Sequence, residues 1–156
     1  MIWLLVLVFA QEPQVCAPCH NEQIGDLKTH KHSAKGMECS VCHGASLKHR
    51  ESTGNVPPDR VAAPEEVATL CGSCHVQEKT DYLVSAHQRA LLAHKVKSAN
   101  CVTCHGPHSL KVWSANEAAC SRCHVATPAS CKNESVKKSA RVSCMNCHAS
   151  HSLSAK

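Results

Sequence analysis

The hydrophobic positions of this chain recur at helical rather than strand spacing. Two stretches, residues 21–36 and 79–97, are predicted to be helices. The second has one face whose members are three or four residues apart: Leu83, His87, Leu91 and His94. No run of alternating apolar and polar residues is long enough to predict a strand. The pattern therefore predicts a mostly α or irregular fold of short helices and loops, with little or no β-sheet.

Shorter signals mark turns, a linker and the start of the chain. Proline opens a predicted helical turn at residues 64–70, and residues 114–117 (Ser-Ala-Asn-Glu) have the spacing of a capping box. Residues 51–63 contain Thr-Gly-Asn and Pro-Pro sequences, which favour a linker. Residues 1–10 are an apolar run that resembles a signal peptide or a short anchor, too short to span a bilayer as a helix. Residues 11–156 are expected to form one domain.

The apolar residues are too small to build an interior by themselves. Phe, Trp and Tyr make up 3% of the 156 residues, and much of the 43% hydrophobic content is Ala and Cys. A chain of this size needs a substantial buried apolar surface to be stable. We therefore expect a bound group to supply part of the core.

A five-residue unit, Cys-x-x-Cys-His, occurs six times. Its histidines are His20, His43, His75, His105, His124 and His148. Its cysteines are Cys16, Cys19, Cys39, Cys42, Cys71, Cys74, Cys101, Cys104, Cys120, Cys123, Cys144 and Cys147. This unit attaches c-type haem: the two thiols bind one porphyrin, and the histidine is the proximal iron ligand. Zinc sites and disulfides also use paired cysteines, but neither requires a histidine after every pair.

Six covalently bound haem c groups change how the composition is interpreted. They would fill the interior, with 156 residues shared among six haems, or 26 for each. We therefore expect the chain to fold only as haem is attached. The formal net charge of +5 would suggest anionic partners, but twelve haem propionates outweigh it, so nucleic acid is not indicated. Attachment of c-type haem outside the cytoplasm predicts an extracytoplasmic protein: periplasmic, membrane-associated or extracellular.

The six units form three pairs, which predict two-haem modules at residues 16–50, 71–110 and 120–152. In the first two modules a histidine follows the first unit's histidine by twelve residues, and a further histidine follows the second unit of every pair. The candidate sixth iron ligands are His32, His49, His87, His94, His108 and His151. Of His30 and His94, one is expected to be an ordinary solvent-exposed residue.

The third module departs from this plan, because no histidine lies between its two units and Lys137 stands where the second module has His87. The sequence leaves five choices for the missing sixth ligand: His94, Lys137, the thiolate of Cys131, a histidine of another protomer, or none. Cys131 is the one cysteine outside the six units and is otherwise a spare structural thiol. Methionines do not recur between modules, so histidine ligation and a low reduction potential are predicted.

Three segments resemble multihaem c-type cytochromes, here a hexahaem one: Cys42-His43-Gly44, Cys104-His105-Gly-Pro-His108-Ser and Cys147-His148-Ala-Ser-His151-Ser. The resemblance covers about residues 15–152. It implies haems packed in stacked and perpendicular pairs, and it implies that His108 and His151 each ligate the iron of a neighbouring haem. It also implies that electrons pass along this chain of haems. Together with histidine ligation, this predicts low-potential electron transfer, suited to anaerobic respiration, rather than an enzyme.

The predicted partners are other redox proteins. One version is a subunit linked to a membrane quinone oxidoreductase complex, and another is a protomer of an extracellular cytochrome filament, which would make the chain a homo-oligomer. The alternative function is a multihaem reductase of a small nitrogen or sulfur oxyanion, which would need a haem with an open sixth position. No unit has lysine in place of the proximal histidine, and the chain is short for a substrate pocket beside six haems.

Overall fold

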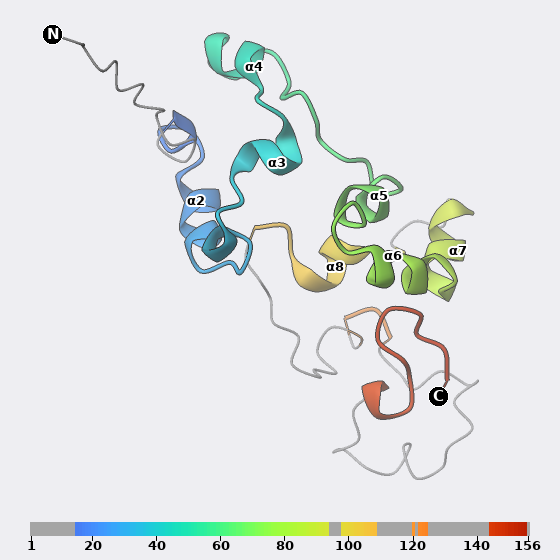
Figure 1. The fold of residues 1–156 in the computed structure, drawn as a ribbon. Helices are drawn as coiled ribbons and strands as arrows, with labels where there is room; N and C mark the ends of the chain where they lie inside the picture. The colour runs from blue at the N-terminus through green and yellow to red at the C-terminus, as the bar shows by residue number, and fades with distance from the viewer. Residues whose placement is uncertain (1–14, 94–97, 109–119, 121, 125–143, 156) are drawn as a thin grey trace, which may run out of the picture. The chain divides into compact units, whose positions relative to one another are not determined.

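The computed structural model describes residues 15–93, 98–108, 120, 122–124 and 144–155. All its named elements are short α-helices or 3-10 helices (Figure 1). Within the described residues there is no named strand, and the one pairing of strand type is an isolated antiparallel bridge between His148 and Ala155. The predicted mostly α or irregular fold is confirmed. By internal contacts the chain divides into two units, Met1–Val61 with Pro107–Leu110, and Ala62–Gly106 with Lys111–Lys156.

The first unit holds four short elements: α2 (Asn21–Lys28), η1 (Ser33–Lys35), α3 (Cys39–His43) and α4 (Leu47–Glu51). α2 packs against η1. In the described part of this unit no hydrophobic side chain is buried; the buried residues are His30 and Ser46. The polypeptide of the first unit therefore provides almost no apolar core of its own.

The helix predicted at residues 21–36 is shorter than expected. α2 ends at Lys28, and the Thr29 hydroxyl donates a hydrogen bond to the carbonyl of Asp26 at 3.0 Å. Such local side-chain bonds compete with helix continuation. The residues from Lys28 to Gly36 also include no large apolar side chain that burial could stabilise. The segment continues instead as turns and η1, whose C-cap is Gly36 with φ of 74°.

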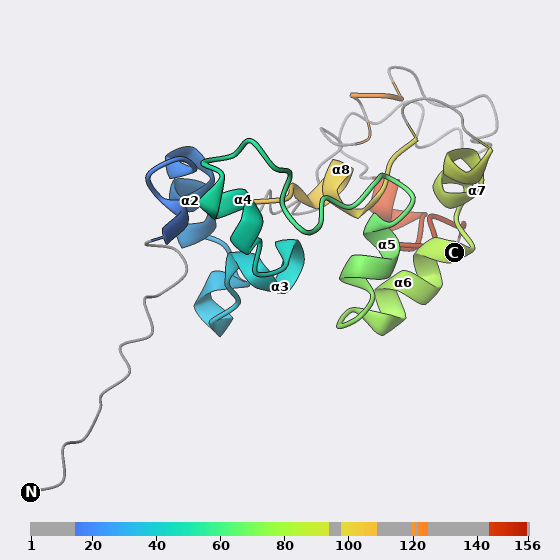
Figure 2. The same cartoon turned by 90° about the horizontal axis from the view of Figure 1, so that it is seen from above.

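The second unit holds five elements: α5 (Val67–Cys71), α6 (Val76–Leu83), α7 (Ala86–Leu92), α8 (Cys101–His105) and η2 (Cys144–Asn146). α5 packs against both α6 and α8, and α6 packs against α7 (Figure 2). All buried hydrophobic residues of the described chain lie here: Val67, Ala68, Tyr82 and Leu91. The Tyr82 hydroxyl donates to the carbonyl of Ala99 at 2.9 Å, which ties α6 to the segment before α8.

The prediction of one helix over residues 79–97 is wrong. α6 ends at Leu83 and α7 begins at Ala86, because Ser85 has extended backbone angles and its hydroxyl accepts a hydrogen bond from the Gln88 N–H. This is an N-cap, which starts a new helix. The single apolar face predicted for this stretch is lost with it, since Leu83 is 45% exposed while Leu91 is 7% exposed.

The turn predicted at residues 64–70 is present as a turn at 64–66 followed by α5. No helix of the described chain has the length and apolar character needed to cross a membrane. Several predicted features lie outside the described residues: the apolar segment 1–10, the capping box at 114–117, His94, Cys131 and Lys137.

Candidate haem sites

Each Cys-x-x-Cys-His unit forms a single helical turn. Two of the six are the helices α3 and α8. In the other four, the histidine N–H donates to the carbonyl of the first cysteine, at 2.9 Å for His20, 3.0 Å for His75, 2.7 Å for His124 and 2.9 Å for His148. Residues three and four apart lie on the same side of a helical turn. Both thiols and the imidazole are therefore presented together, as attachment to one porphyrin requires.

Four histidines of the Cys-x-x-Cys-His units each face a second histidine. Both members of every pair belong to the same one of the two units into which the fold divides. The facing pairs are His20 with His49, His43 with His108, and His87 with His124, each with ring centroids 6.0 Å apart, and His105 with His151 at 6.1 Å. Imidazole nitrogens bind metals at about 2.0–2.1 Å, and each nitrogen lies roughly 1 Å from its ring centre, so rings on opposite sides of one metal ion have centroids about 6 Å apart. The spacing fits an iron held between each pair.

Burial favours the neutral form of several of these rings. It lowers the pKa of His87, His105 and His108, and the facing histidine lowers each pKa further. Neutral imidazole is the form that binds a metal ion. The environment of these rings therefore favours the ligand state over the imidazolium.

Backbone carbonyls orient three further rings. The Nδ1 atoms lie 3.0 Å from the Arg60 carbonyl for His43, 2.7 Å from the Val56 carbonyl for His49, and 2.9 Å from the Leu153 carbonyl for His148. A carbonyl oxygen can only accept, so Nδ1 carries the proton in each ring. This leaves Nε2 with a free lone pair and fixes the ring plane, the usual arrangement of metal-binding histidines.

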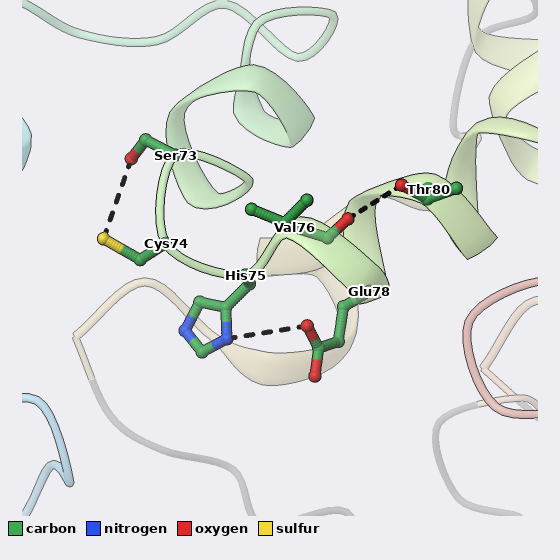
Figure 3. Close-up of polar contacts among 6 residues, drawn as sticks. All are labelled: Ser73, Cys74, His75, Val76, Glu78 and Thr80. Atoms are coloured by element: carbon green, nitrogen blue, oxygen red, sulfur yellow. Dashed lines mark hydrogen bonds and ion pairs between the residues drawn. The ribbon is translucent and has the colours of Figure 1, made fainter.

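The arrangement around His75 is different (Figure 3). His75 directly precedes α6, and its Nδ1 lies 4.0 Å from a carboxylate oxygen of Glu78. Both side chains are about half exposed. Glu78 was not among the predicted site residues. Its signal in the sequence is an acidic residue three positions after the histidine of an attachment unit.

His30 is buried, and its Nδ1 accepts a hydrogen bond from the backbone N–H of His32 at 3.1 Å. The rings of His30 and His32 are 4.6 Å apart, too close for an iron between them. Burial lowers the pKa of His30, and His32 and His108 lower it further. One of His30 and His94 was expected to be solvent-exposed. His30 is not exposed, and His94 lies outside the described residues.

The facing pairs connect different units of the sequence. His49, His108 and His151 each follow one Cys-x-x-Cys-His unit and face the histidine of an earlier one. In the third module His124 faces His87, which the five choices for the missing ligand did not include. His32 stays a predicted ligand.

Cysteines of neighbouring attachment units also lie together. A hydrogen bond between the thiols of Cys71 and Cys101 raises the pKa of Cys71 and lowers that of Cys101 to about 7. Burial raises the pKa of Cys120, and neighbouring Cys144 raises it further. The attachment turns that begin at Cys71 and Cys101 are therefore adjacent. The same holds for the turns that begin at Cys120 and Cys144.

Single-turn attachment units with facing histidines define a multihaem c-type cytochrome. Residues 24–106 match the family described as cytochrome c7 and related cytochrome c, and the chain belongs to this family. The matched range contains three of the six attachment units in full. No match was found among curated proteins or solved structures. The family assigns haem c, electron transport and an extracytoplasmic location to the chain.

Proposed function

We propose that this chain transfers electrons at low potential through six covalently attached haems, between extracytoplasmic or membrane redox partners, and that it transforms no substrate. The observation that carries the proposal is the set of four imidazole pairs about 6 Å apart. Haem c, when bound, supplies an iron that gains and loses one electron. The polypeptide attaches, orients and tunes it.

The proposed ligands are the six histidines of the attachment units and six others. These others are His32, His49, His87, His94, His108 and His151. Histidine on both sides of an iron favours a lower potential than a Met/His pair does. The twelve unit cysteines are proposed to bind the porphyrins covalently, and the proposed organisation remains three two-haem modules.

The same pairs argue against the reductase alternative. Reduction of a nitrogen or sulfur oxyanion requires an open sixth position at one iron. A second imidazole faces His20, His43, His105 and His124, so these four sites have no such position. Electron transfer needs no open position, and it agrees with the geometry of these four sites.

The proposed partners are other redox proteins. Candidates are a membrane quinone oxidoreductase complex and, in a filament, further copies of this chain; nucleic acid is not among them. The short stretch of polypeptide available per haem supports exposed porphyrin edges at which a partner can dock. Size-exclusion chromatography with electron microscopy separates the two candidates, because a filament protomer assembles without a second protein.

The proposal is tested by removing one facing histidine from the haem-loaded protein. His87→Ala is expected to convert one haem of six from low-spin to high-spin in electron paramagnetic resonance and to raise its potential, with the haem count unchanged. Arg89→Ala, on the same helix and exposed, is the matched control and should leave the spectrum unaltered. A wild-type protein that already has a high-spin haem and turns over nitrite, hydroxylamine or sulfite would contradict the proposal. So would a His87→Ala spectrum identical to wild type.

A further inference from the structure

In the described chain, His75 differs from the attachment histidines His43 and His148 in the charge of the group next to its Nδ1. His43 and His148 have neutral backbone carbonyls at 3.0 and 2.9 Å. His75 has the Glu78 carboxylate at 4.0 Å, and the two side chains point toward each other (Figure 3). A negative charge therefore lies behind this ring, on the side away from Nε2.

Local helix geometry puts Glu78 there. His75 is the N-cap of α6 and Glu78 lies in its first turn. Residues three apart in a helix lie on one side. The turn is fixed by a hydrogen bond from Lys79 N–H to the His75 carbonyl at 3.0 Å, and by one from the Thr80 hydroxyl to the Val76 carbonyl at 2.9 Å (Figure 3).

The helix that follows His20 supplies a natural comparison. His20 is likewise the N-cap of an eight-residue helix, α2, which also has a glutamate in its first turn. That glutamate is Glu22, two residues after His20, and the position three residues after His20 is the neutral Gln23. Residues two apart on a helix do not face each other. Both helices thus have a glutamate in the first turn. Of the two, only α6 has it three residues after the histidine, where the carboxylate faces the ring.

We propose that the negative charge of Glu78, beside His75, lowers the reduction potential of the haem attached at Cys71 and Cys74. This inference rests on the proposed function, since it requires haem at that unit. The carboxylate lies 4.0 Å from Nδ1, beyond hydrogen-bond distance, so it acts on the haem through its charge. A nearby negative charge stabilises the oxidised iron relative to the reduced iron. Solvent screens the charge because both side chains are half exposed.

The size of the effect follows from that exposure. We expect removal of the Glu78 charge to change the ratio of reduced to oxidised haem at this one site by up to about tenfold at a fixed potential, which is about 59 mV for a one-electron couple. The other haems should change much less. The haem at Cys71 and Cys74 would thus be reduced later than it would be without Glu78.

The test is a potential-resolved spectroscopic titration of haem-loaded, full-length protein. Glu78→Gln should raise the potential of one haem and shift one low-spin signal in electron paramagnetic resonance. Glu22→Gln, the matched control, also removes one carboxylate from the first turn after a unit histidine, and should leave the titration unchanged. Identical titrations for Glu78→Gln and wild type, or equal shifts in both variants, would overturn the inference.

A second variant keeps the test decisive if Glu78→Gln does not yield haem-loaded protein. Gln23→Glu places a carboxylate three residues after His20 and should lower the potential of one haem; an unchanged titration in that case overturns the inference. Failure of the proposed function is a separate result. It would show as wild-type protein that lacks the haems or does not exchange electrons reversibly.

Discussion

The stretch after His20 and the stretch after His75 begin alike and end differently. Each histidine is the N-cap of an eight-residue helix, α2 or α6. After α2 the described chain continues in turns and η1 without a buried hydrophobic side chain, whereas after α6 a new helix, α7, contributes the buried Leu91. The same attachment chemistry is thus present on a polypeptide with a small core and on one with almost none. We therefore expect haem to contribute a larger share of the interior in the first unit.

The helices α3 and α8 extend this comparison to the attachment turns themselves. Each is five residues long and is followed by a glycine of positive φ, Gly44 at 73° and Gly106 at 74°. Asn100 forms a capping box with Thr103 before α8, while Glu38 makes no side-chain cap before α3. Asn100 also donates to the Pro64 carbonyl at 3.2 Å. The N-terminus of α8 is therefore capped by a side chain, whereas that of α3 is not.

The largest expected effect comes from the core of the second unit. Leu91→Ala should lower the free energy of unfolding of the haem-loaded protein by about 2–5 kcal/mol, because it leaves a cavity beside packed side chains. Leu92→Ala is the matched control: Leu92 is the next residue on α7 and is 59% exposed, so the expected change is within about 0.5 kcal/mol. Denaturant unfolding followed by circular dichroism measures both. Equal losses would mean that the polypeptide core is not what distinguishes the second unit.

The cap of α8 should give a smaller effect. Asn100→Ala removes the acceptor for the Thr103 N–H and the donor to Pro64, both in a buried place. The expected loss of unfolding free energy is about 1–3 kcal/mol. Glu38→Ala, at the equivalent position before α3, should cost less because no side-chain cap is lost. The comparison between α3 and α8 fails if the two variants unfold at the same denaturant concentration.

Tyr82→Phe should give the smallest effect at neutral pH, about 0.5–1.5 kcal/mol, since it removes one hydrogen bond to Ala99. Burial raises the pKa of Tyr82 from 10.0 to about 12. The unfolded state then ionises first, so the stabilising contribution is complete below about pH 10 and is lost as the pH rises toward 12.

Tyr82 is the chain's single tyrosine, so the matched variant isolates this alkaline effect. Unfolding free energies measured from pH 8 to 12 should decline more steeply for wild type than for Tyr82→Phe. Parallel declines would show that the hydroxyl of Tyr82 is not protected in the folded protein.

The attachment units could be found from the sequence because their chemistry requires neighbours along the chain. Both thiols and the proximal histidine fit within one helical turn, so five residues specify the local site. Which histidines face each other could not be predicted, since His43 and His108 are brought together by the fold rather than by a local turn. The resemblance suggested neighbouring haems for His108 and His151, but it did not suggest that His87 faces His124.

The helix boundaries show a different limit of sequence interpretation. The apolar spacing continues from Leu83 to Leu91 and therefore predicts one helix, but a local hydrogen bond at Ser85 divides it. A signal was present, because Ser85 and Gln88 have capping-box spacing. In the first unit, the Thr29 hydroxyl donates to the Asp26 carbonyl at the end of α2, and no large apolar residue follows before Met37. Local polar bonds decided both boundaries against the longer pattern.

The most direct test of the account is the amount of haem on the native protein. Denatured full-length protein from a host that attaches c-type haem is weighed by mass spectrometry, and its haem is counted by the pyridine haemochrome assay. We expect the polypeptide mass plus six haems that resist acid extraction. A colourless protein, or one with the mass of the bare polypeptide, would contradict the account.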